Sequence, residues 1–115
     1  MFGCLEAIVG ATCILTGAIS VDADTIRLDG QRYRIWAISA PERGHPDYEP
    51  GKAAMGALID GQALTCERMQ LAPSFDRPVV RCVMPDGTDI GEAMIRLGHA
   101  EESCRFSRGA YGECD

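Results

Sequence analysis

Alternating apolar and polar residues mark two strands joined by a tight turn early in the chain. Residues 25–28 and 31–38 flank Asp29-Gly30, and a two-residue Asp-Gly connection is a strong β-hairpin signal. The β-branched, apolar run at residues 13–20 predicts a further strand before this hairpin. The first third of the chain therefore reads as β structure.

Two helices are predicted by the residues expected at their ends. Residues 52–60 follow Pro50 and precede Gly61, and proline near the first turn with glycine just past the last turn is typical of helices. Asp89 is expected to cap a second helix, with Glu92 three residues later in a capping-box-like arrangement.

A second hairpin is predicted at residues 63–71 and 79–84. Three strands, a helix, two strands and a helix predict an α+β, mainly β fold, a five-stranded OB-like barrel with two helices, a class that often binds nucleic acids or sugars. Residues 1–115 are expected to form one domain, with residues 1–10 as an N-terminal extension and 101–115 as a cysteine-containing tail.

The charge composition restricts how this chain can bind nucleic acid. Its net charge is -6, and ten of its eleven basic residues are arginine, the exception being Lys52. Phosphate is repelled by an acidic surface, so any nucleic-acid contact should be local and built on a few arginines, which bind phosphate through a bidentate fork.

Six cysteines in a short chain favour disulfides and an oxidising compartment. Cys66 and Cys82 should lie on neighbouring antiparallel strands, and Cys104 with Cys114 would hold the tail, which leaves Cys4 with Cys13. Fifteen pairings are formally possible, and six reduced, buried thiols are the alternative. A zinc site is disfavoured because the sequence has no Cys-x-x-Cys spacing.

The first twenty residues are apolar, but they carry no basic start and are interrupted by Glu6. They are too short and broken for a membrane span and do not resemble an intact export signal. A remnant of a processed export signal is the alternative for these residues. The cysteines lead us to expect an exported protein, and we also expect a monomer without a membrane partner.

The charged residues of the segment at 21–42 suggest a site for a cation and a phosphate. Asp22 and Asp24 are two apart, so on an extended strand both side chains point to one face. Paired carboxylates repel each other unless a positive charge lies between them, and oxygen ligands suit a hard cation such as calcium. A solvated surface hairpin is the alternative for the residue types alone.

The order of these residues resembles the thermonuclease family, the staphylococcal-nuclease-like domain. The resemblance runs from about Thr16 to Glu113. The segments that carry it are Asp22-Ala23-Asp24-Thr25, Arg34 to Glu42 with the Ala40-Pro41-Glu42 ending, His45-Pro46, Asp76 to Cys82, Asp86 to Ala100, and Cys104 to Tyr111.

This resemblance implies phosphodiester hydrolysis of DNA or RNA with little sequence preference. It implies that Asp24 holds a divalent cation, with Ca²⁺ expected first and Mg²⁺ or Mn²⁺ as alternatives. It also implies that Glu42 orients or activates the attacking water and that Arg34 binds the phosphate. Arg77 is the expected second arginine, although its hairpin is about three residues shorter than the family's. Asp22 is expected to orient the site rather than to bind the metal.

Several positions depart from the family pattern. Ala23 replaces the glycine between the two aspartates, which is tolerated only if φ there is below zero. Ser39 stands where a second metal-binding aspartate is expected, so the metal site loses one formal charge. Ala40 replaces a threonine that offers its backbone carbonyl, which survives the change. Cys104 and Phe106 stand where the family carries base-binding tyrosines. Phe106 would stack on a base or pack within the tail. The alternative functions are a catalytically impaired OB-like module that binds nucleic acid or protein, and a disulfide-held structural protein.

Overall fold

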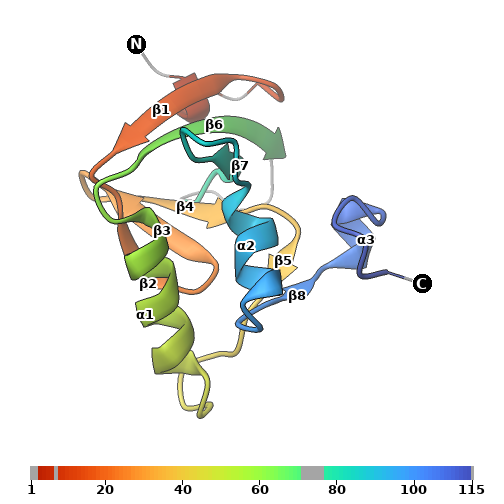
Figure 1. The fold of residues 1–115 in the computed structure, drawn as a ribbon. Helices are drawn as coiled ribbons and strands as arrows, with labels where there is room; N and C mark the ends of the chain where they lie inside the picture. Colours follow the sequence, from red (N-terminus) through yellow and green to blue (C-terminus); the bar gives the residue numbers. More distant parts are fainter. Residues whose placement is uncertain (1–2, 7, 71–76, 115) are drawn as a thin grey trace.

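The computed structural model describes residues 3–6, 8–70 and 77–114 (Figure 1). Strands predominate over helices in the described residues, so the predicted α+β, mainly β class is confirmed. The elements in chain order are η1 (Gly3–Leu5), β1 (Thr12–Thr16), β2 (Ile19–Asp22), β3 (Thr25–Leu28), β4 (Gln31–Ile35), β5 (Ile38–Ser39), α1 (Tyr48–Ile59), β6 (Ala63–Gln70), β7 (Val79–Val83), α2 (Ile90–Arg96), β8 (Glu101–Glu102) and α3 (Cys104–Ser107).

The strands of the described residues form a six-stranded sheet in the order β1-β6-β7-β4-β3-β2, and a separate pair, β5 with β8. All ladders are antiparallel except β4 with β7. The sheet is open, because no ladder joins its outer strands β1 and β2 within the described residues. The described sheet thus has six strands rather than the predicted five, because the run at 13–20 divides at Gly17, whose φ is 86°.

The β3–β4 hairpin forms around the predicted turn. Asp29 and Gly30 both have positive φ, 52° and 79°, the combination that matches the twist of the flanking strands. β4 ends at Ile35, three residues earlier than predicted, because Ala37 has a φ of 62° and interrupts the extended backbone. The chain then resumes as β5, which pairs with β8 instead of continuing the main sheet.

Both predicted helices are present, although α1 begins at Tyr48 rather than at residue 52. Pro50 lies inside its first turn, where proline is tolerated because the N–H groups have no partner within the helix. The backbone N–H of Glu92 donates to the Asp89 carboxylate at 3.1 Å, which confirms the predicted cap of α2. In Figure 1, α1 lies beside β2 and β3, and α2 lies near the centre of the view.

The core lies between the sheet and the two longer helices. Its fully buried side chains come from every part of the chain and include Ile26, Ile35, Met55, Val80 and Met94. Burying each such side chain stabilises the fold by about 1.5–3 kcal/mol. The polar residues of β3 and β4 alternate with these core residues and therefore lie on the opposite face of the sheet.

All three predicted disulfides are present: Cys4–Cys13, Cys66–Cys82 and Cys104–Cys114. Cys66 lies directly opposite Cys82 on β6 and β7, as the predicted hairpin requires, and opposite Cys13 on β1. Disulfides persist in oxidising compartments. No helix within the described ranges is both long and apolar enough to cross a lipid bilayer.

We predict that removing the Cys66–Cys82 disulfide lowers the free energy of unfolding by about 3 kcal/mol, because a bridge of this span restricts the unfolded chain. The Cys66→Ala/Cys82→Ala variant and the wild type should be compared by urea unfolding without reductant. The Cys104→Ala/Cys114→Ala variant is the control, since its bridge lies in the tail and closes a shorter loop. A smaller loss for the first variant than for the control would contradict this prediction.

Candidate active site

A cleft of about 650 Å³ opens where four separate segments of the chain converge. These segments are the β2–β3 turn, β4, the stretch from Ser39 to Tyr48, and Arg77, which lies two residues before β7. The cleft collects all six of the predicted catalytic and metal-binding residues. Its lining comprises Val21, Asp22, Asp24, Arg32, Arg34, Ser39, Ala40, Pro41, Glu42, Arg43, Tyr48 and Arg77.

Asp22 and Asp24 meet through a turn, not along an extended strand as predicted. β2 ends at Asp22, Ala23 and Asp24 form a turn, and β3 starts at Thr25. The backbone N–H of Asp24 donates to Oδ1 of Asp22 at 3.1 Å. Through this bond, Asp22 holds the turn that presents Asp24. Ala23 does not have a positive φ, so alanine fits at this position without backbone strain.

Asp24 is an electrostatically unbalanced carboxylate. Its pKa is raised from 3.8 to about 6, first by burial and then by the neighbouring Asp22, while the Arg34 guanidinium opposes both effects. The ion pair to Arg34 measures 3.1 Å between Oδ2 and Nη1, and the Thr25 hydroxyl donates to Oδ1 at 3.2 Å. One guanidinium therefore does not fully compensate two neighbouring carboxylates.

Arg34 is held in place by backbone carbonyl groups. Its Nη1 donates to the carbonyl oxygens of Asp24 and Ile35 at 3.3 and 3.2 Å, and its Nη2 donates to that of Ile38 at 2.8 Å. A guanidinium carries five N–H donors. Its Nε–H and one Nη2–H make no hydrogen bond within the described residues, and they remain for an anion in the cleft that Arg34 lines.

Arg77 reaches the cleft through the parallel pairing of β4 with β7. Arg34 is in register with Val79, and its backbone N–H donates to the Pro78 carbonyl at 2.9 Å. Arg77 precedes Pro78 and so lies beside Arg34 at the cleft wall, despite the shortened hairpin. Asp76 and the rest of the connection at 71–76 lie outside the described residues. The cleft thus receives two arginines from segments more than forty residues apart in the sequence.

Ser39, Ala40 and Glu42 form the wall opposite the turn. Ser39 is exposed at the end of β5, and Glu42 is exposed in the following loop. The Glu42 carboxylate makes no hydrogen bond or ion pair with the described part of the chain. It is therefore available to accept a proton from water.

The donor atoms at this wall and turn suit a hard cation. Asp24 offers carboxylate oxygens, Ser39 a hydroxyl and Ala40 a backbone carbonyl, all of which are hard ligands. The raised pKa of Asp24 comes first from burial and then from the neighbouring Asp22, and a bound cation would offset both effects. The set carries less negative charge than one with aspartate at position 39, so the expected cation affinity is modest.

Phe106 lies outside the main cleft, on α3. It is 47% exposed, with the Arg105 guanidinium over its ring at 5.6 Å. Together with Arg34 it lines an adjoining cavity of about 150 Å³. The predicted packing of this ring within the tail is therefore only partial, and one face stays open to solvent near the cleft.

Three cleft residues were missed by the sequence analysis: Arg32, Arg43 and Tyr48. Arg43 lies over the Tyr48 ring at 5.8 Å from its guanidinium carbon. The signal for Arg32 was present, because residues two apart on a strand share a face and Arg34 had been identified. Tyr48 could not be inferred, because its place at the cleft depends on the start of α1.

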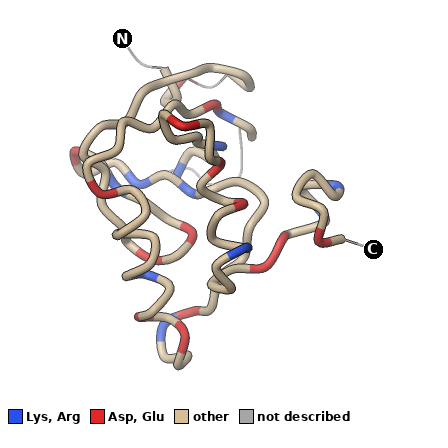
Figure 2. Tube along the Cα trace, in the orientation of Figure 1, with Lys and Arg blue, Asp and Glu red and all other residues tan. Residues whose placement is uncertain are grey.

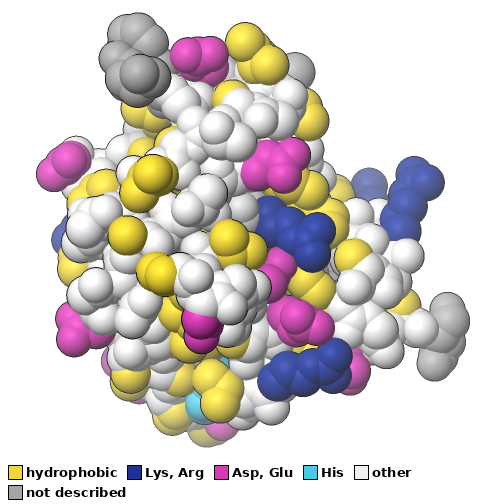
Figure 3. Space-filling view, turned by 45° about the horizontal axis from the view of Figure 1, so that its top comes forward, with side chains coloured by type: hydrophobic (Ala, Val, Ile, Leu, Met, Phe, Trp, Pro, Cys, Tyr) yellow, Lys and Arg dark blue, Asp and Glu magenta, His cyan; other side chains and the backbone are white. Residues whose placement is uncertain are grey.

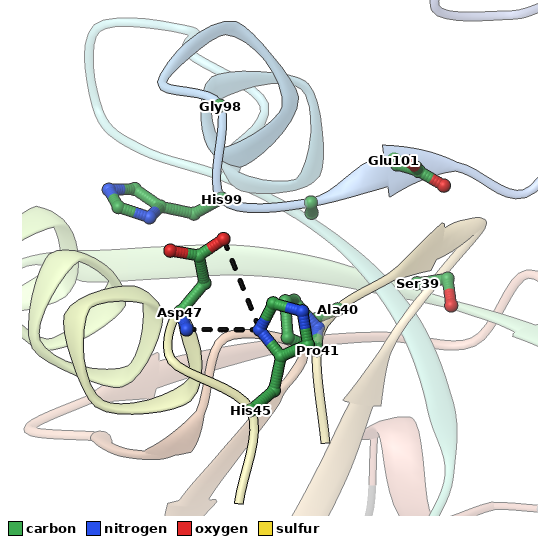
Figure 4. Close-up of a pocket in the computed structure, with 9 residues that line it drawn as sticks. Ser39, Ala40, Pro41, His45, Asp47, Gly98, His99 and Glu101 are labelled. Atoms are coloured by element: carbon green, nitrogen blue, oxygen red, sulfur yellow. Dashed lines mark hydrogen bonds and ion pairs between the residues drawn. The ribbon is translucent and has the colours of Figure 1, made fainter. Parts of the chain in front are cut away.

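A second cavity of about 360 Å³ lies on the other side of residues 39–41 (Figure 4). The Asp47 backbone N–H donates to His45 Nδ1 at 3.0 Å, so His45 serves to hold its loop. Figure 4 shows the His99 ring directed away from that of His45, which separates the two imidazoles. A third cluster joins Glu102, Cys104 and Cys114, but its two sulfurs form a disulfide and offer no thiolate to a metal.

No protein-family model matches the chain. It is 28% identical, over 120 aligned residues, to the succinoglycan biosynthesis protein ExoI of Rhizobium meliloti (strain 1021). The alignment covers 95% of this chain and 59% of that protein. The chain thus spans about three fifths of the length of the curated relative it matches.

We predict that Asp24 makes the protein less stable as the pH rises. Its pKa is raised from 3.8 to about 6 on folding, so the folded state binds more protons than the unfolded state between these values. The free energy of unfolding therefore falls by up to about 3 kcal/mol as the pH rises through this window. Asp24→Asn, which has no proton to lose, should not show this fall in urea unfolding at about pH 4 to pH 7.

The control for this prediction is Asp60→Asn, which removes the same charge at the exposed end of α1. Subtracting each variant's curve from that of the wild type isolates the contribution of one carboxylate. Identical pH profiles for Asp24→Asn and Asp60→Asn would contradict the assigned pKa.

Proposed function

We propose that this protein is a small metal-dependent nuclease of the thermonuclease type with an altered metal site. Its substrate would be DNA or RNA, cut at phosphodiester bonds with little sequence preference. The observation that carries the proposal is one cleft lined by Asp24, Arg34, Glu42 and Arg77, which come from four separate segments of the chain. This set combines charge for a phosphate, a carboxylate for water and a carboxylate for a cation.

The proposed reaction is attack of water on phosphorus. Glu42 accepts a proton from the water as the new P–O bond forms, and the P–O bond to the leaving sugar oxygen breaks. The leaving oxygen takes a proton from solvent. Arg34 and Arg77 bind the non-bridging oxygens, whose negative charge grows in the transition state. Preorganised donors of this kind contribute about 10²–10³ in rate each.

Asp24, Ser39 and the Ala40 carbonyl would hold a divalent cation, with Ca²⁺ the first expectation and Mg²⁺ or Mn²⁺ as alternatives. When bound, such a cation neutralises charge on the phosphoryl group and favours ionisation of nearby water. The Asp22 carboxylate keeps Asp24 oriented, because it accepts a hydrogen bond from the Asp24 backbone N–H within the turn. Arg34, anchored on three carbonyls, keeps its position whether or not substrate is present.

An OB-like barrel is the fold we propose for this nuclease. β1 and β2 stand at opposite ends of the sheet order, yet only Gly17 and Ala18 separate them in the chain. Because the chain bends at Gly17, this short connection holds the two outer strands of the sheet close together. Their proximity supports a barrel that is closed by the covalent connection rather than by a ladder of hydrogen bonds. The three disulfides likewise support export to an oxidising compartment.

A binding module without catalysis is the second candidate. Ser39 favours it, because a neutral hydroxyl stands where a charged metal ligand is expected. The name of the relative, a succinoglycan biosynthesis protein, adds the possibility that such a module takes part in that pathway. Hydrolysis assays separate the two candidates directly.

We predict metal-dependent cleavage of fluorescent single-stranded DNA or RNA by the wild-type protein. Parallel reactions with calcium, magnesium, manganese and chelator identify the metal and the substrate. Glu42→Ala should lower the rate by about 10²–10⁴, because it removes the proton acceptor. Glu49→Ala, an exposed glutamate in the first turn of α1, is the matched control. Equal activity of wild type and Glu42→Ala under every metal would leave the binding module as the function.

We predict that Ser39→Asp strengthens calcium binding by tenfold or more, because each added carboxylate raises calcium affinity markedly. Calorimetric titration with calcium measures the affinity, and the cleavage assay measures the accompanying gain in rate. Ala57→Asp adds the same charge on an exposed face of α1 outside the cleft. If both variants bind calcium with wild-type affinity, the assignment of Ser39 to the metal site is wrong.

A further inference from the structure

Three arginines lie on one face of the β3–β4 hairpin. Arg27 on β3 is directly opposite Arg32 on β4, and directly opposite residues share a face of the sheet. Arg34 lies two residues beyond Arg32 and so projects from the same face. The alternate residues Ile26, Tyr33 and Ile35 are buried in the core, which fixes the arginines on the outer face.

The pairing of Arg27 with Arg32 is electrostatically unfavourable without an anion. Like charges directly opposite each other destabilise a strand pair. Both side chains are exposed, and within the described ranges neither guanidinium has a hydrogen bond or an ion pair. The two positive charges therefore face solvent together in a protein whose net charge is -6.

Two arginines outside the hairpin are paired with carboxylates. Arg81 pairs with Asp89 at 2.7 Å, and Arg96 pairs with Glu92 at 3.3 Å and with Glu113 at 3.1 Å. On the face shown in Figure 3, patches of basic side chains border acidic ones. Arg27 and Arg32 differ from these two, because they have no carboxylate partner within the described ranges and lie directly opposite each other. This juxtaposition favours an external anion between them.

The hairpin arginines are continuous with the cleft. Arg32 lines it together with Arg34, whereas Arg27 lies one strand further out. Figure 2 shows basic positions following the strand labelled β4 in Figure 1. Arg32 and Arg34 are about 7 Å apart along the strand, a spacing comparable to that of successive phosphates in an extended single strand.

We propose that Arg27 and Arg32 form a track that binds the phosphates flanking the scissile one in single-stranded DNA or RNA. This inference rests on the proposed function and adds to it the direction in which the substrate leaves the cleft, along the β3–β4 hairpin. The arginine fork binds phosphate oxygens in pairs. A short track of this kind provides local attraction in an otherwise acidic protein.

The test measures binding apart from cleavage. Fluorescence anisotropy with a labelled single-stranded oligonucleotide of about 12 nucleotides, on the Glu42→Gln background, gives the affinity across a salt series. Arg27→Gln and Arg32→Gln should each weaken binding about fivefold at 0.1 M salt and lower the log–log salt slope by about 0.7, the value for one phosphate contact on a single strand. Arg108→Gln, which removes an exposed charge after α3, is the matched control.

Salt slopes of both hairpin variants equal to that of Arg108→Gln would overturn the track, while cleavage by the wild type would leave the nuclease proposal intact. Lower slopes in a protein that never cleaves would support the track and refute catalysis instead. Competition by polygalacturonate, a polycarboxylate, as effective as competition by unlabelled oligonucleotide would refute the assignment to phosphate.

Discussion

The short parallel ladder between β4 and β7 is the constraint on which the site depends. It is the junction in the sheet order between the β1-β6-β7 group and the β4-β3-β2 group, and its register pairs are Arg34 with Val79 and Ile35 with Val80. The buried Ile35 and Val80 side chains secure it from the core side. Because Arg77 precedes β7, the same ladder brings the second arginine to the cleft.

Charges of one sign are grouped at two places around this junction, with carboxylates at the β2–β3 turn and arginines on the β3–β4 hairpin. At the turn, Arg34 pairs with Asp24 but not with the neighbouring Asp22, and the pKa of Asp24 rises to about 6 as a result of burial and of Asp22. On the adjoining hairpin, Arg27 and Arg32 lack carboxylate partners among the described residues. A cation at the turn and a phosphate chain on the hairpin would relieve both imbalances at once.

The tail is attached to the same region by a buried polar cluster. The Tyr111 hydroxyl donates to the Asp89 carboxylate, which also pairs with Arg81, and the Tyr111 ring packs edge-on against Trp36 at 5.7 Å. Burial and the nearby Asp89 charge raise the pKa of Tyr111, so it stays a donor. With the Cys104–Cys114 bridge, this attachment keeps α3 and its exposed Phe106 close to Arg34.

By itself, the sequence determined those features that depend on local chemistry or on the order of motifs. Asp29-Gly30 specifies its turn, Asp89 specifies its cap, and the strand positions of Cys66 and Cys82 specify their disulfide. The order of motifs also identified the cleft residues Asp24, Arg34, Glu42 and Arg77.

Only the tertiary structure decided where β4 stops, that Asp22 and Asp24 meet in a turn, and that Tyr48 joins the cleft. The physical reason is that these features depend on contacts between distant segments. The positive φ of Ala37 accompanies the pairing of β5 with β8, and the backbone of Ser103, near the tail, donates to the Ala37 carbonyl. The residues around Ala37 do not indicate that this segment contacts β8 and Ser103, so the sequence predicted a strand that continues to Ile38.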